Sequence, residues 1–336
     1  MIGAATRHGG RIGLIALAFG TAFVFSNALR AAAPERAQNW QAAWPRTDFT
    51  KHSVDLDEIR SGGPPKDGIP SIDDPKFVPV SEMTELAPSE PVIGLEINGD
   101  ARAYPLRILT WHEIANDTVG GVPVAVTYCP LCNAAIVFDR RIDGRAVEFG
   151  TTGKLRYSDL VMYDRETESW WQQFSGEAIV GARTGTRLKM LPARLESWQK
   201  FAARHPDGRV LVPNDPNMRP YGANPYVGYD SARVPFLYDG ELPRDIEPLA
   251  RVVVVGDEAW SFDLLRRQRR IESGDLILTW EPGQNSALDT RAIAEGRDVG
   301  NVLVQRRTGQ GLVDVRYDAT FAFVFKAFRP DGVLHK

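Results

Sequence analysis

Cysteine is scarce in this sequence, whose 336 residues contain only two, Cys129 and Cys132. Both lie in a short turn at residues 127–133 that follows an apolar run. A structural tetrahedral metal site needs four protein ligands, and the sequence has no second cysteine pair to complete one. A metal held here would take its other ligands from elsewhere in the chain, which leaves an incomplete and open coordination sphere.

An excess of basic residues is also missing, because the formal net charge is -3. Nothing in such a chain would neutralise a phosphate backbone, so nucleic-acid binding is not expected. Three motifs are absent as well: a phosphate-cradling glycine loop before a helix, a Gly-x-Ser-x-Gly elbow and a His-Glu-x-x-His pair. No segment after the N-terminus is apolar for long enough to span a bilayer.

Residues 1–33 are typical of a signal peptide for export. Arg7 and Arg11 form a positive end, residues 12–25 are largely apolar, and residues 31–33 are alanines suited to cleavage. An uncleaved N-terminal anchor is the alternative, since the apolar run extended to Leu29 just reaches the minimum length for a span. Either way we expect a periplasmic or secreted protein, with membrane contact only through this segment if it stays uncleaved. Two thiols in an oxidising compartment form a disulfide, cycle through one or bind a metal.

Local patterns predict an α+β protein dominated by β-structure, with short helices. Strands are expected at residues 92–97 and on both sides of the cysteine turn, at 122–128 and 134–139, where they form a hairpin. Pro105 suits the start of a short helix because its fixed φ is compatible with the first helical turn. The apolar spacing of residues 193–204 predicts a later amphipathic helix.

Five stretches of sequence recur in the same order along the chain. Among them, Cys-Pro-Leu-Cys-Asn at residues 129–133 matches Glu-Pro-Gly-Gln-Asn at residues 281–285. We therefore predict two tandem, related β-rich units that arose by internal duplication and pack together. They are residues 70–213, which carry the cysteine site, and residues 226–336, a degenerate copy. Residues 34–69 form an N-terminal extension that ends in a loop rich in glycine and proline.

Three interpretations of the cysteine turn are open. A structural disulfide would close a loop of about four residues and stabilise the fold by roughly 2 kcal/mol. Thiol–disulfide exchange suits closely spaced cysteines, but the usual motif opens a helix, whereas a hairpin is expected here. A metal site is indicated because the turn looks like half of a rubredoxin or zinc-ribbon knuckle, and thiolates favour zinc, copper(I) or iron. The matched turn lacks sulfur, so the fold can make it without a disulfide.

Few side chains can join the two sulfurs, because the chain has only five histidines. His112, on the short helix before the cysteine strand, is the best third metal ligand beside Cys129 and Cys132. Glu113 is a candidate general base, or a partner that orients a ligand. The predicted catalytic residues are therefore Cys129, Cys132, His112 and Glu113.

An extra segment of the first unit, within residues 150–176, mixes aromatic and charged side chains as ligand pockets often do. An ordinary β-hairpin with cross-strand aromatic packing is the alternative. The candidate ligand-binding residues of this segment are Tyr157, Asp159, Tyr163, Asp164, Arg165 and Trp171.

Several motifs are familiar as a set. They are the glycine- and proline-rich loop at 61–70, Trp-His-Glu-Ile at 111–114, Asn-Asp-Thr-Val-Gly-Gly at 116–121, the cysteine turn, and Ser-Asp-Leu-Val-Met-Tyr-Asp at 158–164. Together they resemble the bacterial and archaeal domain-of-unknown-function family 3179. The resemblance covers nearly all of the mature chain. It implies an exported protein with the cysteine turn as a family hallmark, and it implies no particular reaction.

The sequence thus predicts an exported protein with a metal-binding or thiol-redox site on Cys129 and Cys132. Its partner would be an unidentified small molecule or a redox partner. The alternative is a non-catalytic binding or assembly protein. In that case the two cysteines form a static disulfide, and residues 156–173 bind a ligand or a partner.

Overall fold

Short β-strands dominate the structure, as the sequence predicts. The computed structural model describes Met1 and residues 39–336, and it is 40% strand and 14% helix. Apart from Met1, the signal peptide or anchor predicted at residues 1–33 lies outside the described residues. From residue 39 onward the chain belongs to a single compact unit.

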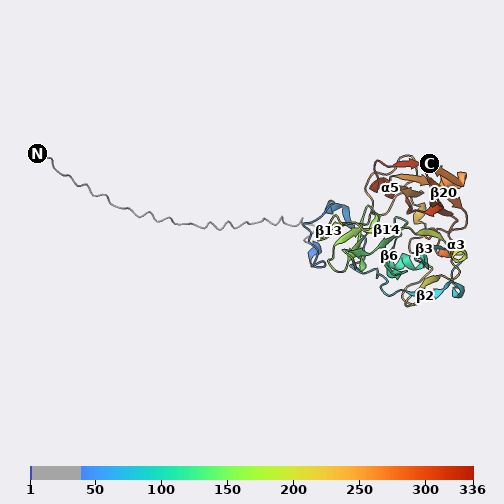
Figure 1. The fold of residues 1–336 in the computed structure, drawn as a ribbon, viewed down its shortest axis with the longest axis horizontal. Helices are drawn as coiled ribbons and strands as arrows, with labels where there is room; N and C mark the ends of the chain where they lie inside the picture. Colours follow the sequence, from blue (N-terminus) through green and yellow to red (C-terminus); the bar gives the residue numbers. More distant parts are fainter. Residues whose placement is uncertain (2–38) are drawn as a thin grey trace. The chain divides into compact units, whose positions relative to one another are not determined.

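Five small sheets are arranged as the blades of a five-bladed β-propeller (Figure 1). The first sheet contains, in spatial order, β1 (Ile59–Ser61), β10 (Phe149–Arg156), β11 (Asp159–Asp164), β12 (Trp170–Gln172) and β13 (Glu177–Val180). The second contains β14 (Lys189–Leu191), β7 (Ala134–Asp139), β6 (Val122–Cys129) and β5 (Ile114–Val119). The third contains β15 (Arg194–Ser197), β3 (Pro91–Ile97), β4 (Asp100–Pro105), β16 (Arg209–Val212) and β2 (Lys76–Pro79).

The remaining sheets come from the C-terminal part of the chain. The fourth contains β23 (Asp318–Phe321), β17 (Arg251–Val255), β18 (Glu258–Ser261) and β24 (Val333–His335). The fifth contains β19 (Arg270–Ser273), β20 (Leu276–Glu281), β21 (Asn301–Thr308) and β22 (Gly311–Asp314). A small ribbon pairs β8 (Arg141–Ile142) with β9 (Arg145–Ala146).

The helices are short connections between strands. The α-helices are α2 (Leu106–His112), α3 (Trp198–Arg204), α4 (Phe262–Gln268) and α5 (Ala322–Phe328), and the 3-10 turns are η1 (Leu56–Glu58), η2 (Val80–Glu82), η3 (Tyr229–Ser231) and η4 (Ile293–Glu295). As predicted, α2 begins directly after Pro105. No helix among residues 39–336 combines the length and apolarity needed to cross a membrane.

The amphipathic helix predicted at residues 193–204 forms only in its second half. Residues 194–197 are strand β15 instead, and they pair antiparallel with β3. The helix α3 then starts at Trp198. Backbone pairing with a buried strand has overridden the helical spacing of this stretch, which periodicity alone does not reveal.

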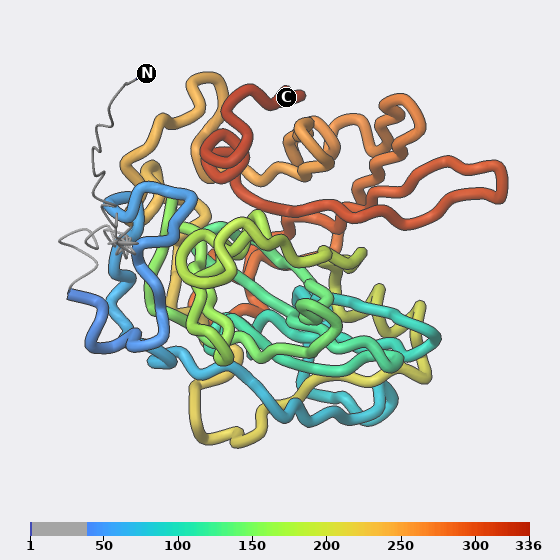
Figure 2. The backbone as a smooth tube through the Cα atoms, turned by 60° about the vertical axis from the view of Figure 1, so that its left-hand side comes forward, coloured from blue at the N-terminus to red at the C-terminus, as the bar shows by residue number. Residues whose placement is uncertain are grey.

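The predicted pair of tandem duplicated units is wrong, because five small sheets, and not two repeated bodies, make up the chain. The cysteine turn lies in the second sheet, and its match at residues 281–285 follows β20 in the fifth. The sequence similarity between these two turns reflects the short antiparallel strand pairs that recur from one propeller blade to the next. It is loose and does not mark two duplicated units. Distant strands also complete sheets: β1 pairs with β10, and Figure 2 shows this N-terminal blue segment beside the yellow-green strands.

Buried side-chain amides join the first two sheets, which carry the candidate site. Asn116 on β5 donates to the Phe149 carbonyl at 2.8 Å and accepts from the Phe149 amide at 3.0 Å. It also donates to the Asp73 carboxylate at 2.8 Å. Gln173 makes a second link by donating to the Thr127 hydroxyl at 2.9 Å. These bonds fix how the β10–β11 hairpin meets the β6–β7 hairpin.

We predict that Asn116→Ala destabilises the protein by about 2–4 kcal/mol, because the buried amide and carbonyl of Phe149 lose their partner. Asn214→Ala is the matched control, since its single side-chain hydrogen bond, to the Asp74 carbonyl at 2.8 Å, is exposed. We expect it to cost less than about 1 kcal/mol. Urea unfolding of both variants measures the difference, and equal losses would contradict the role of Asn116 as the joint between sheets.

Candidate functional site

The two cysteines lie where β6 turns into β7, in the hairpin that the sequence predicts. Cys129 is paired with Ala134 across the hairpin. Within the turn, the Cys132 amide donates to the Cys129 carbonyl at 3.2 Å. Asn133 has a φ of 52°, a left-handed conformation that asparagine tolerates better than most residues. The turn is therefore shaped by its own backbone bonds and its asparagine, without a disulfide.

Strand β23 holds the far side of this turn. The Thr320 hydroxyl donates to the Cys132 carbonyl at 2.8 Å, and the Phe321 amide donates to the same oxygen at 3.2 Å. The turn is thus fixed by a strand almost two hundred residues away in the chain, as the 188-residue separation of Thr320 and Cys132 shows.

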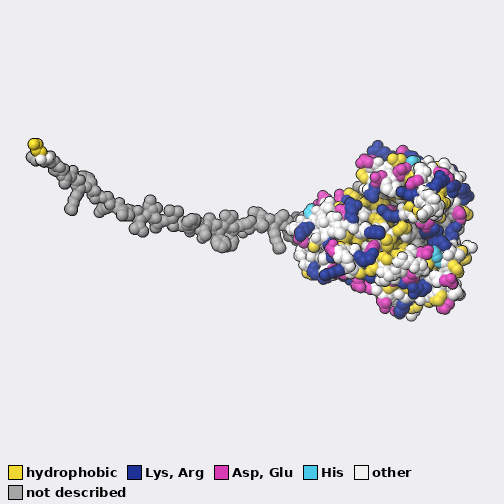
Figure 3. Space-filling view, viewed as in Figure 1, with side chains coloured by type: hydrophobic (Ala, Val, Ile, Leu, Met, Phe, Trp, Pro, Cys, Tyr) yellow, Lys and Arg dark blue, Asp and Glu magenta, His cyan; other side chains and the backbone are white. Residues whose placement is uncertain are grey.

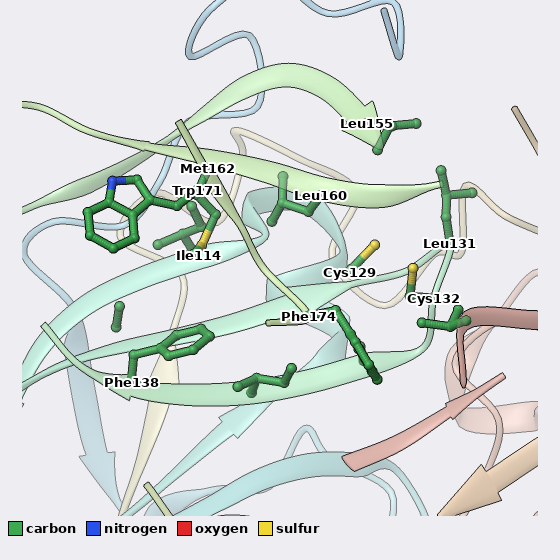
Figure 4. Close-up of a cluster of buried hydrophobic side chains, with 14 of the residues drawn as sticks. Ile114, Cys129, Leu131, Cys132, Phe138, Leu155, Leu160, Met162, Trp171 and Phe174 are labelled. Carbon is green, nitrogen blue, oxygen red and sulfur yellow. The ribbon is translucent and has the colours of Figure 1, made fainter. Parts of the chain in front are cut away.

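Both sulfurs are buried and face the β10–β11 hairpin. Cys129 is 2% and Cys132 is 0% exposed. Figure 4 shows the two sulfurs pointing to the same side, near Leu160. Both thiols donate to the Ser158 carbonyl oxygen, which is 3.8 Å from the Cys129 sulfur and 3.5 Å from the Cys132 sulfur.

The turn that brings Ser158 to the sulfurs is strained. Tyr157 and Ser158 have φ values of 54° and 64°, as a two-residue hairpin turn requires, yet neither is the glycine or asparagine usually found there. Each left-handed residue costs about 1–2 kcal/mol. The Ser158 hydroxyl donates to the Phe236 carbonyl at 2.5 Å, which helps to hold the turn. Retained strain of this kind is typical of functional sites.

Asp159 follows this turn and joins the two cysteines. One carboxylate oxygen and both sulfur atoms all lie within 4.8 Å of one another, and all three residues are buried. Asp159 Oδ2 accepts hydrogen bonds from Gln172 at 2.6 Å and from the Phe174 amide at 2.9 Å. The other oxygen, Oδ1, is buried and has no hydrogen-bond partner among the described residues. Burial raises the pKa of Asp159 to about 6, although the hydrogen bonds from Phe174 and Gln172 and the nearby thiols act against the increase.

The charges around the sulfurs disfavour thiolates in the metal-free protein. Burial raises the pKa of both thiols. The negative charge of Asp159 raises both further, and that of Glu113 adds to the effect at Cys129. A buried acid beside other acids avoids this cost in one of two ways. It keeps its proton, or a cation binds beside its charged form.

Glu113 is the fourth acid of this buried group. It is 8% exposed, and its backbone lies against the cysteine strand because its carbonyl accepts from the Tyr128 amide at 2.8 Å. Its φ of 58° at the end of α2 turns the chain away from the helix. Burial, together with the charge of Asp159, raises the pKa of Glu113 to about 8.

Residues 226–242, which we call the cover segment, pack over the cysteine cluster. Tyr226, Tyr229 and Leu237 are among the partly buried side chains that contact its apolar residues. The Tyr229 hydroxyl donates to the Leu131 carbonyl at 3.0 Å and accepts from the Phe236 amide at 3.3 Å. The cover segment is therefore bonded directly to the cysteine turn.

His112 lies outside the cysteine cluster. One ring nitrogen, Nδ1, is 2.7 Å from the Pro70 carbonyl, and the other, Nε2, is 2.7 Å from the Tyr221 hydroxyl. Both nitrogens are thus engaged, and the group of possible ligands found among the described residues contains Asp159 in place of His112.

Most of the other predicted ligand-binding residues serve the first sheet. The carboxylate of Asp164 accepts from the Trp171 ring nitrogen at 2.9 Å and from the Thr167 amide at 2.7 Å. The Tyr163 hydroxyl donates to Asp67 at 2.5 Å. Trp171 is buried in the same hydrophobic core as the cysteines, but none of Tyr163, Asp164 and Trp171 belongs to the group of possible metal ligands.

Arg165 and Tyr157 also make structural contacts. Arg165 forms an ion pair with Asp73 at 2.8 Å. The Tyr157 hydroxyl donates to Glu58 at 2.9 Å, and its ring packs edge-on against Phe328. Of the six candidates in this segment, Asp159 alone is brought into the cluster with the sulfurs.

Sequence reasoning missed Ser158 and the cover segment. The motif Ser-Asp at residues 158–159 was a signal for Ser158, but its contribution is a carbonyl oxygen, which any residue has. Tyr226 and Tyr229 come from a long stretch with little regular structure, in which no periodic pattern marks a buried face. Their position over the cysteines follows only from the folded chain.

We predict that Glu113 makes the metal-free protein less stable as the pH rises. The native state keeps a proton that the unfolded chain releases above about pH 4.5, and it loses that proton only near pH 8. From about pH 5.5 to 7.5 the free energy of unfolding should fall by about 2 kcal/mol more in the wild type than in Glu113→Gln. Urea unfolding with a chelator present measures this, and parallel pH profiles of the two proteins would refute it.

Comparisons with known proteins identify a family for this chain, but no activity is described for that family. Residues 66–332 match the family described as "Protein of unknown function (DUF3179)". No curated protein and no solved structure matches the chain. The family match spans most of the chain, including the cysteine turn and Asp159, and confirms the resemblance seen in the sequence. The chain therefore belongs to the DUF3179 family of proteins of unknown function.

Proposed function

We propose that this protein binds a thiophilic metal ion through Cys129, Cys132 and Asp159. The observation that carries the proposal is the buried Asp159 Oδ1, which has no hydrogen-bond partner among the described residues and belongs to a carboxylate grouped with two sulfurs. A buried carboxylate oxygen without a donor is costly. A cation at this position would satisfy it and stabilise both thiolates at the same time.

The ligand types narrow the choice of metal. Two thiolates and one carboxylate suit zinc, copper(I) or iron better than magnesium or calcium, which prefer oxygen ligands alone. Zinc bonds are about 2.3 Å to sulfur and about 2.0–2.2 Å to oxygen, so a cluster that spans up to 4.8 Å between ligand atoms can enclose one ion. When bound, such an ion would act as a Lewis acid on a fourth ligand. Glu113 is the nearby acid that could supply or orient that ligand.

Metal binding is better supported than thiol–disulfide exchange. A redox-active cysteine needs a lowered pKa and access to its partner. Here burial raises the pKa of both thiols, and neither side chain is more than 2% exposed. The cover segment separates the sulfurs further from any partner.

We also propose that the metal site acts outside the cytoplasm, as the signal-like residues 1–33 suggest. A buried site keeps thiolates from oxidation in that compartment if the metal binds before the chain is exposed to oxidants. Both charge signs are interspersed on the face shown in Figure 3.

We predict that protein purified without oxygen carries about one thiophilic metal ion per chain and that Cys129→Ser/Cys132→Ser carries almost none. Elemental analysis measures the content. His112→Gln serves as the control, because His112 is bonded to Pro70 and Tyr221 and should leave the content unchanged. An equal metal content in the wild type and the double variant would contradict the proposal. A metal-free wild type whose mass is two hydrogens short would establish the static disulfide instead.

A second prediction concerns Asp159→Asn, which should lower metal affinity at least tenfold, because a charged ligand is replaced by a neutral amide. The same change should stabilise the metal-free protein by about 2–3 kcal/mol at pH 7, because a buried carboxylate with a raised pKa is removed. The asparagine oxygen can still accept from Gln172 and Phe174.

The matched control is Asp164→Asn, at the other end of the same strand, where the carboxylate receives bonds from Thr167 and Trp171. We expect this variant to lose stability and to keep its metal. Calorimetric metal titration and chelator-treated urea unfolding give the two readouts. If Asp159→Asn destabilised the metal-free protein and left the affinity unchanged, its carboxylate would be structural.

A further inference from the structure

A groove of about 640 Å³ lies in the C-terminal part of the molecule, and none of Cys129, Cys132 and Asp159 lines it. It is lined by residues from η3, the start of β17, α4 and the end of β20. Six basic and four acidic side chains line it, so positive charge is in excess. The basic residues are Arg233, Arg251, Arg266, Arg267, Arg297 and Lys336. The volume falls within the usual range for small-molecule sites.

Arg251 is a buried cation in this lining. Its side chain is 8% exposed. One nitrogen, Nη2, donates to Asp230 at 3.0 Å and to Ser286 at 2.7 Å. Its Nε is buried and has no hydrogen-bond partner among the described residues. Burial lowers the pKa of Arg251 although Asp230 raises it. Asp230 and the Phe321 ring, whose centroid lies 5.4 Å from the guanidinium carbon, stabilise the charge, while Nε keeps a donor with no partner among the described residues.

Two acids of the lining form ion pairs with arginines of the same lining. Asp230 is shared, because Arg297 also pairs with it at 3.1 Å. The carboxylate of Asp298 accepts from the backbone amides of Gly283 and Gly300 at 2.9 Å. Asp263 pairs with Arg266, and Glu247 is the remaining acid. The excess positive charge of the groove therefore rests on the basic side chains that these acids do not pair with.

Two arginines of the lining, Arg233 and Arg267, form no ion pair with any described residue. Both are exposed and lie in the groove with Arg251. A guanidinium offers a planar fork of donors that fits a carboxylate or a phosphate. Apolar surface stands beside these charges, since Phe262, Trp280 and Leu249 belong to the same lining. The groove thus combines a place for an anion with a place for an apolar body.

We propose that this groove binds a small organic anion, whose carboxylate or phosphate group is held by Arg233, Arg251 and Arg267 and whose apolar body lies along Phe262 and Trp280. The site is separate from Cys129 and Cys132, so it goes beyond the metal-binding proposal and does not depend on it. Arg251 on β17 pairs with Phe321 on β23, the strand that also holds the cysteine turn.

Four probes test the proposal by isothermal titration calorimetry of the full chain. Phenyl phosphate and phenylacetate carry both an anionic group and a ring, inorganic phosphate carries only the anion, and benzyl alcohol carries only the ring. We expect saturable binding of phenyl phosphate or phenylacetate that is at least about tenfold tighter than binding of either single-feature probe, because both parts of the groove are then used. The stronger of the two aromatic anions identifies phosphate or carboxylate as the preferred group.

The variant that tests the arginines is Arg233→Gln/Arg267→Gln, which removes two exposed side chains without ion pairs and should fold normally. We expect it to weaken binding of the aromatic anion about tenfold or more. Arg291→Gln is the control, because Arg291 is exposed and lies outside the groove. Metal content, measured in parallel, should be the same in all three proteins.

Three results would overturn the proposal. They are a lack of saturable binding by either aromatic anion, equal affinities for inorganic phosphate and phenyl phosphate, and equal weakening by the groove variant and by Arg291→Gln. The first shows that there is no site, the second that the apolar wall takes no part, and the third that only net charge matters. None of these results bears on metal content, so failure here is distinguishable from failure of the metal site.

Discussion

Four acidic groups are buried together between the first and second sheets, and the arrangement of the site depends on this constraint. The thiols of Cys129 and Cys132 and the carboxyls of Asp159 and Glu113 all have raised pKa values, because burial penalises their charged forms. The charge of Asp159 raises the pKa values of the two thiols and of Glu113 further. Such a group must either keep its protons or gain a cation. When a metal ion binds, the acids lose their protons and the charge of the ion compensates their negative charges. Three of the acids that destabilise the metal-free fold, Cys129, Cys132 and Asp159, would then become the ligands of the metal.

The surrounding structure is arranged to keep this group in place. Asn116 joins the sheets on one side, and strand β23 holds the cysteine turn on the other. The strained turn at Tyr157 and Ser158 persists because the pairing of strands β10 and β11 on either side fixes its backbone conformation. Fixed backbone on three sides gives the sulfurs little freedom to move apart. Preorganisation of this kind lowers the entropy that a bound ion would otherwise have to overcome.

The sequence predicted those features of the site that depend on interactions between neighbouring residues in the chain. The hairpin around the cysteine turn follows from alternating apolar residues and an asparagine that accepts a positive φ, and both features lie within a dozen residues. Asp159 was recognised as a candidate but in a different role, because its approach to the sulfurs depends on which sheets are neighbours. His112 and Glu113 show the limit most clearly. They are adjacent in sequence, yet one faces Pro70 and Tyr221 while the other is buried near Cys129. The positive φ of Glu113 at the helix end separates their directions, and spacing alone does not encode it.

The cover segment has a consequence for kinetics. An ion behind Tyr226 and Tyr229 could leave only after the bonds from the Tyr229 hydroxyl to Leu131 and Phe236 had broken. Its residence time would then be governed by the frequency of local opening and not by the strength of the metal–sulfur bonds. Affinity and exchange rate would be set by different parts of the chain, so each could change in evolution without altering the other.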